Sequence, residues 1–240
     1  MIIILIWYIV TKNGLIQSYF LPSPSSVINA GYALIVRDNF LNDVMYSLVR
    51  IFIGFTVGAA LAIPLGLLVG SNKKMELFFE PVIDFVRYTP IPAFVPLLIL
   101  WLGIGEVEKI VIISASVFFQ LVLMIANSVS QVPKDMVQFG ETLGLNKFSI
   151  VSRIILPFSW PRIVDDMRVS LGWAWSSLLI AEIVGSTSGI GFVIIQSQRL
   201  LKTENVIFAI IVVGLLGILF DQLFKVAQKF LFPWFRKSAI

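Results

Sequence analysis

Long apolar runs alternate with shorter polar connections along this chain. Residues 51–70 and 110–133 contain 20 and 24 consecutive residues without a charge, and 88–105, 169–195 and 205–220 contain at most one. A helix needs roughly 20 apolar residues to cross the ~30 Å hydrocarbon core of a bilayer. Together with an apolar N-terminal run, the pattern predicts an all-α integral membrane protein with about six transmembrane helices in a single domain, 1–240.

Two of the predicted spans have unusual features. The N-terminal run Met1–Val10 has only ten residues, and it lacks the basic segment and small-residue cleavage site of a signal peptide. We therefore expect a spanning helix whose beginning is missing, or one that starts late. Residues 88–105 include Pro90, Pro92 and Pro96, which predict an irregular entry into that span because proline lacks a backbone donor.

Small residues form a stripe on the most apolar predicted span, 51–70. Gly54, Gly58, Ala62 and Gly66 recur at intervals of four, so they share one helical face. Small side chains let a second helix approach closely within a membrane. This stripe predicts a helix-packing face.

Composition supports the membrane assignment and excludes several kinds of chemistry. Hydrophobic residues make up 58% of the chain and charged residues 13%, with a mean hydropathy of +0.94, whereas about 25% of a globular domain is charged. Cysteine and histidine are absent. This excludes disulfides, thiolate chemistry and the usual zinc and imidazole sites, and we predict neither a catalytic residue nor a metal site.

Basic residues are unevenly distributed among the polar connections. Segments 71–87, 134–168 and 221–240 hold 12 Lys and Arg residues. The connections on the other side hold five, in 11–44, 106–109 and 199–204. The positive-inside rule makes the first set cytoplasmic, with both termini on that side of the membrane. This placement explains the net charge of +4 without any binding of nucleic acid.

The largest polar connection, 134–168, carries a helical pattern of its own. Met136, Phe139 and Leu143 share one helical face, and Gly144 then interrupts the pattern. A second apolar stripe, Ile150 to Ile155, ends before Pro157. The pattern predicts two short helices that meet at a glycine on the membrane surface. It fits a docking element for a soluble partner, or an amphipathic loop lying on lipid headgroups.

The second half of this connection resembles the EAA loop of ABC-transporter permeases. That pattern reads E-A-A, three residues, G, nine residues, then I-x-L-P. Here nine residues separate Gly144 from Ile154, and Leu156 and Pro157 complete the pattern.

The first half departs from the family pattern. Gln138 stands where the family has glutamate, and Phe139 and Gly140 replace the two alanines. This puts a charge-based contact from position 138 in doubt, whereas the glycine turn and the apolar face remain.

Further strings resemble permeases of the nitrate, sulfonate, taurine and bicarbonate group, in the same order along the chain. They are LPSPSSV at 21–27, the SLxRxxxGF pattern of 47–55, the TPIP segment that begins at Thr89, and AEIVGSTSGIG at 181–191.

The resemblance implies a type I ABC importer permease fold and a set of partners. These are a second permease copy, cytoplasmic ABC ATPase subunits, an extracytoplasmic substrate-binding protein and the lipid of a bacterial cytoplasmic membrane. ATP and Mg would be bound by the ATPase, since this chain lacks a P-loop. The cargo would be a small solute, such as nitrate, a sulfonate, taurine or bicarbonate. The residues implied in ATPase coupling are Gln138, Phe139, Gly140, Leu143, Gly144, Leu156 and Pro157.

Three polar residues inside predicted spans are pathway candidates. Gln120 and Asn127 are seven apart and share a face. They would line a polar path or form an interhelical hydrogen bond, and we favour the bond. Glu182 would lie at the mouth of the pathway or serve as a structural partner for Arg50 or a backbone amide, and we favour the structural role.

A different class of function is an ATP-independent secondary carrier or small channel. Such carriers often show inverted repeats and intramembrane carboxylates. We find no convincing internal repeat, and Glu182 is the one candidate coupling carboxylate. A non-transporting membrane scaffold is a third possibility. Stoichiometric co-purification of an ATPase separates an importer permease from both.

Overall fold

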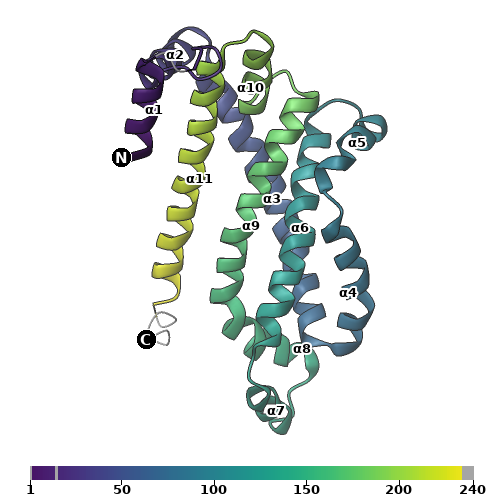
Figure 1. The fold of residues 1–240 in the computed structure, drawn as a ribbon. Coiled ribbons are helices and arrows are strands. Elements are labelled where there is room, and N and C mark those ends of the chain that lie inside the picture. The colour runs from purple at the N-terminus through teal and green to yellow at the C-terminus, as the bar shows by residue number, and fades with distance from the viewer. Residues whose placement is uncertain (1, 14–15, 234–240) are drawn as a thin grey trace.

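The computed structural model describes residues 2–13 and 16–233, and every regular element within them is a helix. Four helices there are long and apolar enough to cross a membrane: Phe40–Ser71 (α3), Glu106–Ser130 (α6), the continuous helix Lys147–Gly185, and Thr203–Leu231 (α11). Figure 1 shows them running side by side along the molecule. This confirms the predicted all-α membrane class.

Shorter helices mark the two ends of the bundle (Figure 1). Pro24–Arg37 (α2) and Ile190–Arg199 (α10) lie at one end, called the α10 end below. Lys134–Thr142 (α7) lies at the opposite end, called the α7 end. The predicted first span corresponds to Ile2–Lys12 (α1), which lies near α2, while Met1 is outside the described residues.

The core lies between α3, α6 and the helix that follows α7. Ile113, Val117, Leu121 and Ile125 recur at intervals of four along α6, and each is fully buried. The predicted small-residue stripe of α3 packs on this face, as the helix-packing interpretation expected. A β-carbon at Gly58 would lie 2.7 Å from the Ser114 carbonyl oxygen, so only glycine allows this close approach.

The span predicted at 88–105 is not a single helix. It contains the end of Lys73–Tyr88 (α4), the 3-10 turn Ile91–Phe94 (η1) and Val95–Leu102 (α5), which follow α3 and precede α6 in sequence. Figure 1 shows α4 and α5 on the side of the bundle next to α6. Segment 71–87, counted above among the polar connections, lies mostly in α4, which runs beside α6. The break at Thr89 and Pro90 has a local cause, because a residue before proline disfavours the α-conformation.

The helix after α7 corrects a second expectation. Pro157 was predicted to end a short helix, but Lys147–Ile150 (α8), the π-helical turn Val151–Ile155 (η2) and Leu156–Gly185 (α9) are continuous. Pro157 occupies the first turn of α9. The wider hydrogen-bond spacing of the preceding π-turn makes room for a residue without a backbone donor. α9 ends at Gly185.

Candidate functional site

The connection between α6 and α9 is built around a glycine turn. Gly144 has φ +76°, and its N–H donates to the Glu141 carbonyl at 2.9 Å. The Leu145 N–H donates to the Gly140 carbonyl at 3.1 Å. This pair of bonds is the Schellman motif, in which a left-handed residue satisfies the last carbonyls of a helix. The predicted glycine corner is therefore confirmed at the end of α7.

The chain re-enters a helix two residues later. The side chain of Asn146 accepts a hydrogen bond from the Ser149 N–H at 2.8 Å, which caps the start of α8. Gly140 allows α7 to pack closely against the start of the long helix, because a β-carbon there would lie 2.5 Å from Ile154 Cδ1. These contacts hold α7 against the beginning of the long helix.

An apolar face of this connection points away from the protein. Phe139, Leu143 and Phe148 expose 65%, 63% and 80% of their surface, and Met136 is also exposed. Because the turn and caps are satisfied internally, this face is displayed by an ordered scaffold. It has the character of an anchor site for a partner, since binding energy concentrates in such large apolar side chains.

The predicted coupling residues divide between this face and the packing beneath it. Gln138, Phe139, Leu143 and Gly144 are exposed on the loop, and Pro157 is exposed at the start of α9. Gly140 is buried under Ile154, and Leu156 packs against the main core. Phe148 was missed from the sequence, although it lies next to the Asn146 cap that starts α8.

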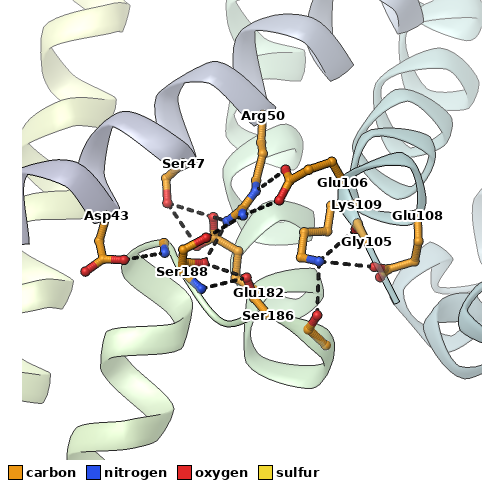
Figure 2. Close-up of polar contacts among 12 residues, drawn as sticks. Asp43, Ser47, Arg50, Gly105, Glu106, Glu108, Lys109, Glu182, Ser186 and Ser188 are labelled. Atoms are coloured by element: carbon orange, nitrogen blue, oxygen red, sulfur yellow. Dashed lines mark hydrogen bonds and ion pairs between the residues drawn. The ribbon is translucent and has the colours of Figure 1, made fainter. Parts of the chain in front are cut away.

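A buried ion cluster lies at the α10 end (Figure 2). Arg50 of α3 donates from Nε and Nη2 to both oxygens of Glu106 at 2.7 and 2.6 Å, and from Nη1 to Glu182 Oε1 at 2.8 Å. It also donates to the carbonyl and hydroxyl oxygens of Ser188. The Arg50 and Glu182 side chains are 2% and 0% exposed, whereas Glu106 is 57% exposed.

Three side chains at the same end of the bundle accept hydrogen bonds from backbone N–H groups at the start of α10. The N–H groups of Gly189, Ile190 and Gly191 donate to Asp43, to the Ser47 hydroxyl and to Glu182, at 2.7, 2.9 and 2.8 Å. The first N–H groups of a helix have no partner within it and favour negative charge. Glu182 therefore contacts both kinds of partner expected for the structural role, Arg50 and a backbone amide. We call Asp43, Ser47, Arg50, Glu106, Glu182 and Ser188 the Arg50 cluster.

Lys109 forms a second group of buried polar contacts beside the Arg50 cluster (Figure 2). Its Nζ donates to the carbonyls of Gly105 and Gly185 at 2.8 and 3.0 Å and lies 3.5 Å from Glu108 Oε2. Gly185 is the last residue of α9, where a lysine favourably meets unpaired carbonyls. Segment 106–109, counted above among the polar connections, is instead the first turn of α6. Acidic residues are common in the first turn of a helix, so the two glutamates after Gly105 are a sequence signal that α6 begins there.

The other two pathway candidates lie far from this cluster. Gln120 and Asn127 line a hollow of about 430 Å³ with Glu76 and Glu80, between α4 and α6. Within the described part of the chain, neither amide side chain makes the interhelical hydrogen bond that we favoured. The face that they share turns toward the hollow, which Glu76 and Glu80 of α4 also line.

Comparisons with known proteins identify relatives over almost the whole chain. The putative aliphatic sulfonates transport permease protein SsuC of Bacillus subtilis is 31% identical over 97% of this chain and 84% of its own length. The taurine transport system permease protein TauC of Escherichia coli is 27% identical over 97% and 86%. An inward-facing MetNI methionine ABC transporter structure has a TM-score of 0.65 at 18% identity, covering 78% of this chain and 94% of the matched chain, and so shares the fold.

The profile of one protein family matches residues 62–237, which include the α7–α8 loop and most of the bundle. With relatives of more than 30% identity over nearly the full chain, this match places the protein in the family of binding-protein-dependent transport system inner membrane components.

Proposed function

We propose that this membrane permease moves a small solute by using ATP hydrolysed in a separate subunit. The observation that carries the proposal is the ordered loop between α6 and α9, with its exposed face of Met136, Phe139, Leu143 and Phe148. This face is the docking site for a cytoplasmic ABC ATPase. The loop is continuous with two long helices, so a displacement of the docked face tilts both as rigid bodies.

The proposed cargo is a small anion or zwitterion. The named relatives are permeases for aliphatic sulfonates and taurine. Nitrate and bicarbonate are small monoanions like the sulfonates, whereas taurine is a zwitterion. The cargo crosses between two copies of the permease after delivery by an external binding protein, which performs most of the selection. The ion-coupled carrier is less favoured because both oxygens of Glu182 are engaged by Ser47, Arg50 and Gly191.

The proposed orientation places the α7 end in the cytoplasm of a bacterium. Lys147 is exposed in the loop, and the chain has no native cysteine. A Lys147→Cys variant in intact cells should resist a membrane-impermeant thiol reagent and react after the membrane is opened. Leu201→Cys, exposed at the α10 end, is the matched position that should react in intact cells. The reverse pattern would contradict the orientation.

The docking face is tested by affinity purification of the permease from cells that express the ATPase. We expect stoichiometric ATPase with the parent chain and about a tenfold or greater loss of affinity for Phe139→Ala, as for a hot-spot aromatic. Phe20→Ala is the matched control, because Phe20 is 66% exposed and Phe139 is 65% exposed. If no ATPase is recovered with the parent chain, the proposed function is wrong.

Two substitutions of Gly144 should impair coupling to different extents. Gly144 has φ +76°, and a β-carbon there would meet nothing within 4 Å in the described structure. Any effect of substitution therefore comes from backbone strain, about 1 kcal/mol or more for a side chain in this region. Gly144→Val should lower ATPase association and substrate-stimulated hydrolysis. Gly144→Asn should retain more of both, because asparagine tolerates the left-handed conformation. Equal activity of the two variants would contradict this role of the turn.

A further inference from the structure

The Arg50 cluster and Lys109 join the ends of four helices that are distant in sequence. We propose that they lock α3, α6, α9 and α10 into one rigid unit, against which the α4–α5 segment moves during transport. Arg50 is then a positioning residue for coupling. The inference rests on the proposed function, because it concerns the path from an ATPase to the far side of the membrane.

The proposed rigid unit is held together by hydrogen bonds and ion pairs of the Arg50 cluster. Arg50 holds the first residue of α6 through Glu106, the end of α9 through Glu182 and the following turn through Ser188. Asp43 and Ser47 attach the same face of α3 to the first turn of α10. Charge-assisted bonds of this kind, made by a buried fork-shaped guanidinium, restrict both distance and angle.

Lys109 adds an independent link between the same elements. Its ammonium group joins the start of α6 at Gly105 to the last carbonyl of α9 at Gly185. α6 and α9 are therefore tied together at the α10 end, and the α7–α8 loop joins the same two helices at the opposite end. A displacement of that loop must move both helices together over their full length.

The α4–α5 segment is held less firmly than the proposed rigid unit. Its helical path is interrupted at Thr89 and Pro90, and Leu100 and Trp101 of α5 are largely exposed. The following turn contains Gly103 and Gly105, where added β-carbons would meet nothing within 4 Å in the described structure. α5 is anchored by Val95, which packs with Ile112 and Ala181, and by the partly buried Leu98 and Ile99. In α4, Ile83 is buried in the main core. Segments with few buried contacts and broken hydrogen-bond ladders open at low free-energy cost.

The experiment measures distances between spin labels in the assembled transporter, in a chain that has no native cysteine. Val49→Cys with Val184→Cys reports α3 against α9, inside the proposed rigid unit. Val49→Cys with Leu100→Cys reports α3 against α5. All three positions are exposed, and singly labelled complexes identify distances between permease copies. Each pair is measured without nucleotide and with ATP and vanadate.

We expect the α3–α9 distance distribution to be the same in both states and the α3–α5 distribution to shift. Glu106→Gln should broaden the α3–α9 distribution and lower the substrate moved per ATP by about fivefold or more, the lower range of coupling between sites. This variant keeps the Arg50–Glu182 pair, so the fold should survive. Glu204→Gln is the control, because Glu204 has no ion pair or hydrogen-bonded side chain among the described residues.

An α3–α9 shift as large as the α3–α5 shift, an immobile α5, or normal coupling in Glu106→Gln would overturn the inference. In each of these cases the parent chain still couples ATP hydrolysis to transport, so the proposed function stands. A parent chain that binds no ATPase refutes the proposed function and this inference with it.

Discussion

Replacing Glu182 by leucine is expected to destabilise the permease by about 3–5 kcal/mol, the usual effect of removing one partner from a buried ion pair. Arg50 is 2% exposed, so its charge would lose its buried counterion and keep only Glu106, which is 57% exposed. Gly191 and Ser47 would lose their acceptor at the same time. The measurement is the midpoint of thermal unfolding in detergent, together with the recovery of monodisperse protein.

A double-mutant cycle isolates the ion pair from the rest of the cluster. Arg50→Leu with Glu182→Leu should be less destabilising than the sum of the two single variants, because no buried member of the pair then lacks the other. Glu106 also loses Arg50, but it is 57% exposed and reaches water. Simple additivity would show that the two side chains act independently.

Glu182→Gln separates the structural role from a role in the pathway. The amide keeps the shape and one acceptor oxygen, so it should be less destabilising than leucine. It still places an N–H₂ group among donors from Arg50, Ser47 and Gly191. The preference between anionic and neutral solutes should not change. An altered preference in a normally assembled transporter would favour the pathway role.

Gly58→Ala is expected to destabilise the bundle by about 1–3 kcal/mol through overpacking. The added methyl group would lie 2.7 Å from the Ser114 carbonyl oxygen and 2.9 Å from Val117 Cβ. Backbone atoms cannot rotate away as side-chain ends do, so α3 and α6 must separate. The change should lower the unfolding midpoint in detergent.

Gly214→Ala is the matched control for this prediction. Gly214 lies in the middle of α11, where an added β-carbon would meet nothing within 4 Å in the described structure. Alanine is favoured over glycine inside a helix by roughly 0.5–1 kcal/mol. The two variants should therefore change stability in opposite directions. A similar loss in both would mean that glycine content, rather than the α3–α6 contact, determines stability.

Local signals in the sequence correctly predicted several parts of this protein. Uncharged runs identified α3, α6 and α11 because the length and polarity of a spanning helix are properties of one segment. Gly144 identified the turn after α7, since a left-handed helix end is satisfied by bonds to neighbours within five residues. The spacing of Gly54, Gly58 and Gly66 predicted a packing face for the same reason.

The tertiary structure decided which distant groups meet. Arg50 and Glu182 are 132 positions apart, and their encounter depends on how α3 and α9 both pack on α6. The same packing turned Gln120 and Asn127 toward a hollow instead of a bonding partner, and it left Phe148 exposed in α8. The π-turn before Pro157 joined two predicted helices into one.

The sequence by itself determined the membrane class, the position of the main spans and the loop between α6 and α9, because each depends on hydrophobicity or hydrogen bonding among near neighbours. The tertiary structure decided the Arg50 cluster, the broken course of α4 and α5 and the inward position of Gly140. These features depend on how far each helix is rotated and shifted relative to the others. Helical periodicity does not determine that rotation or shift; the contacts of the glycine faces and of the buried charges do.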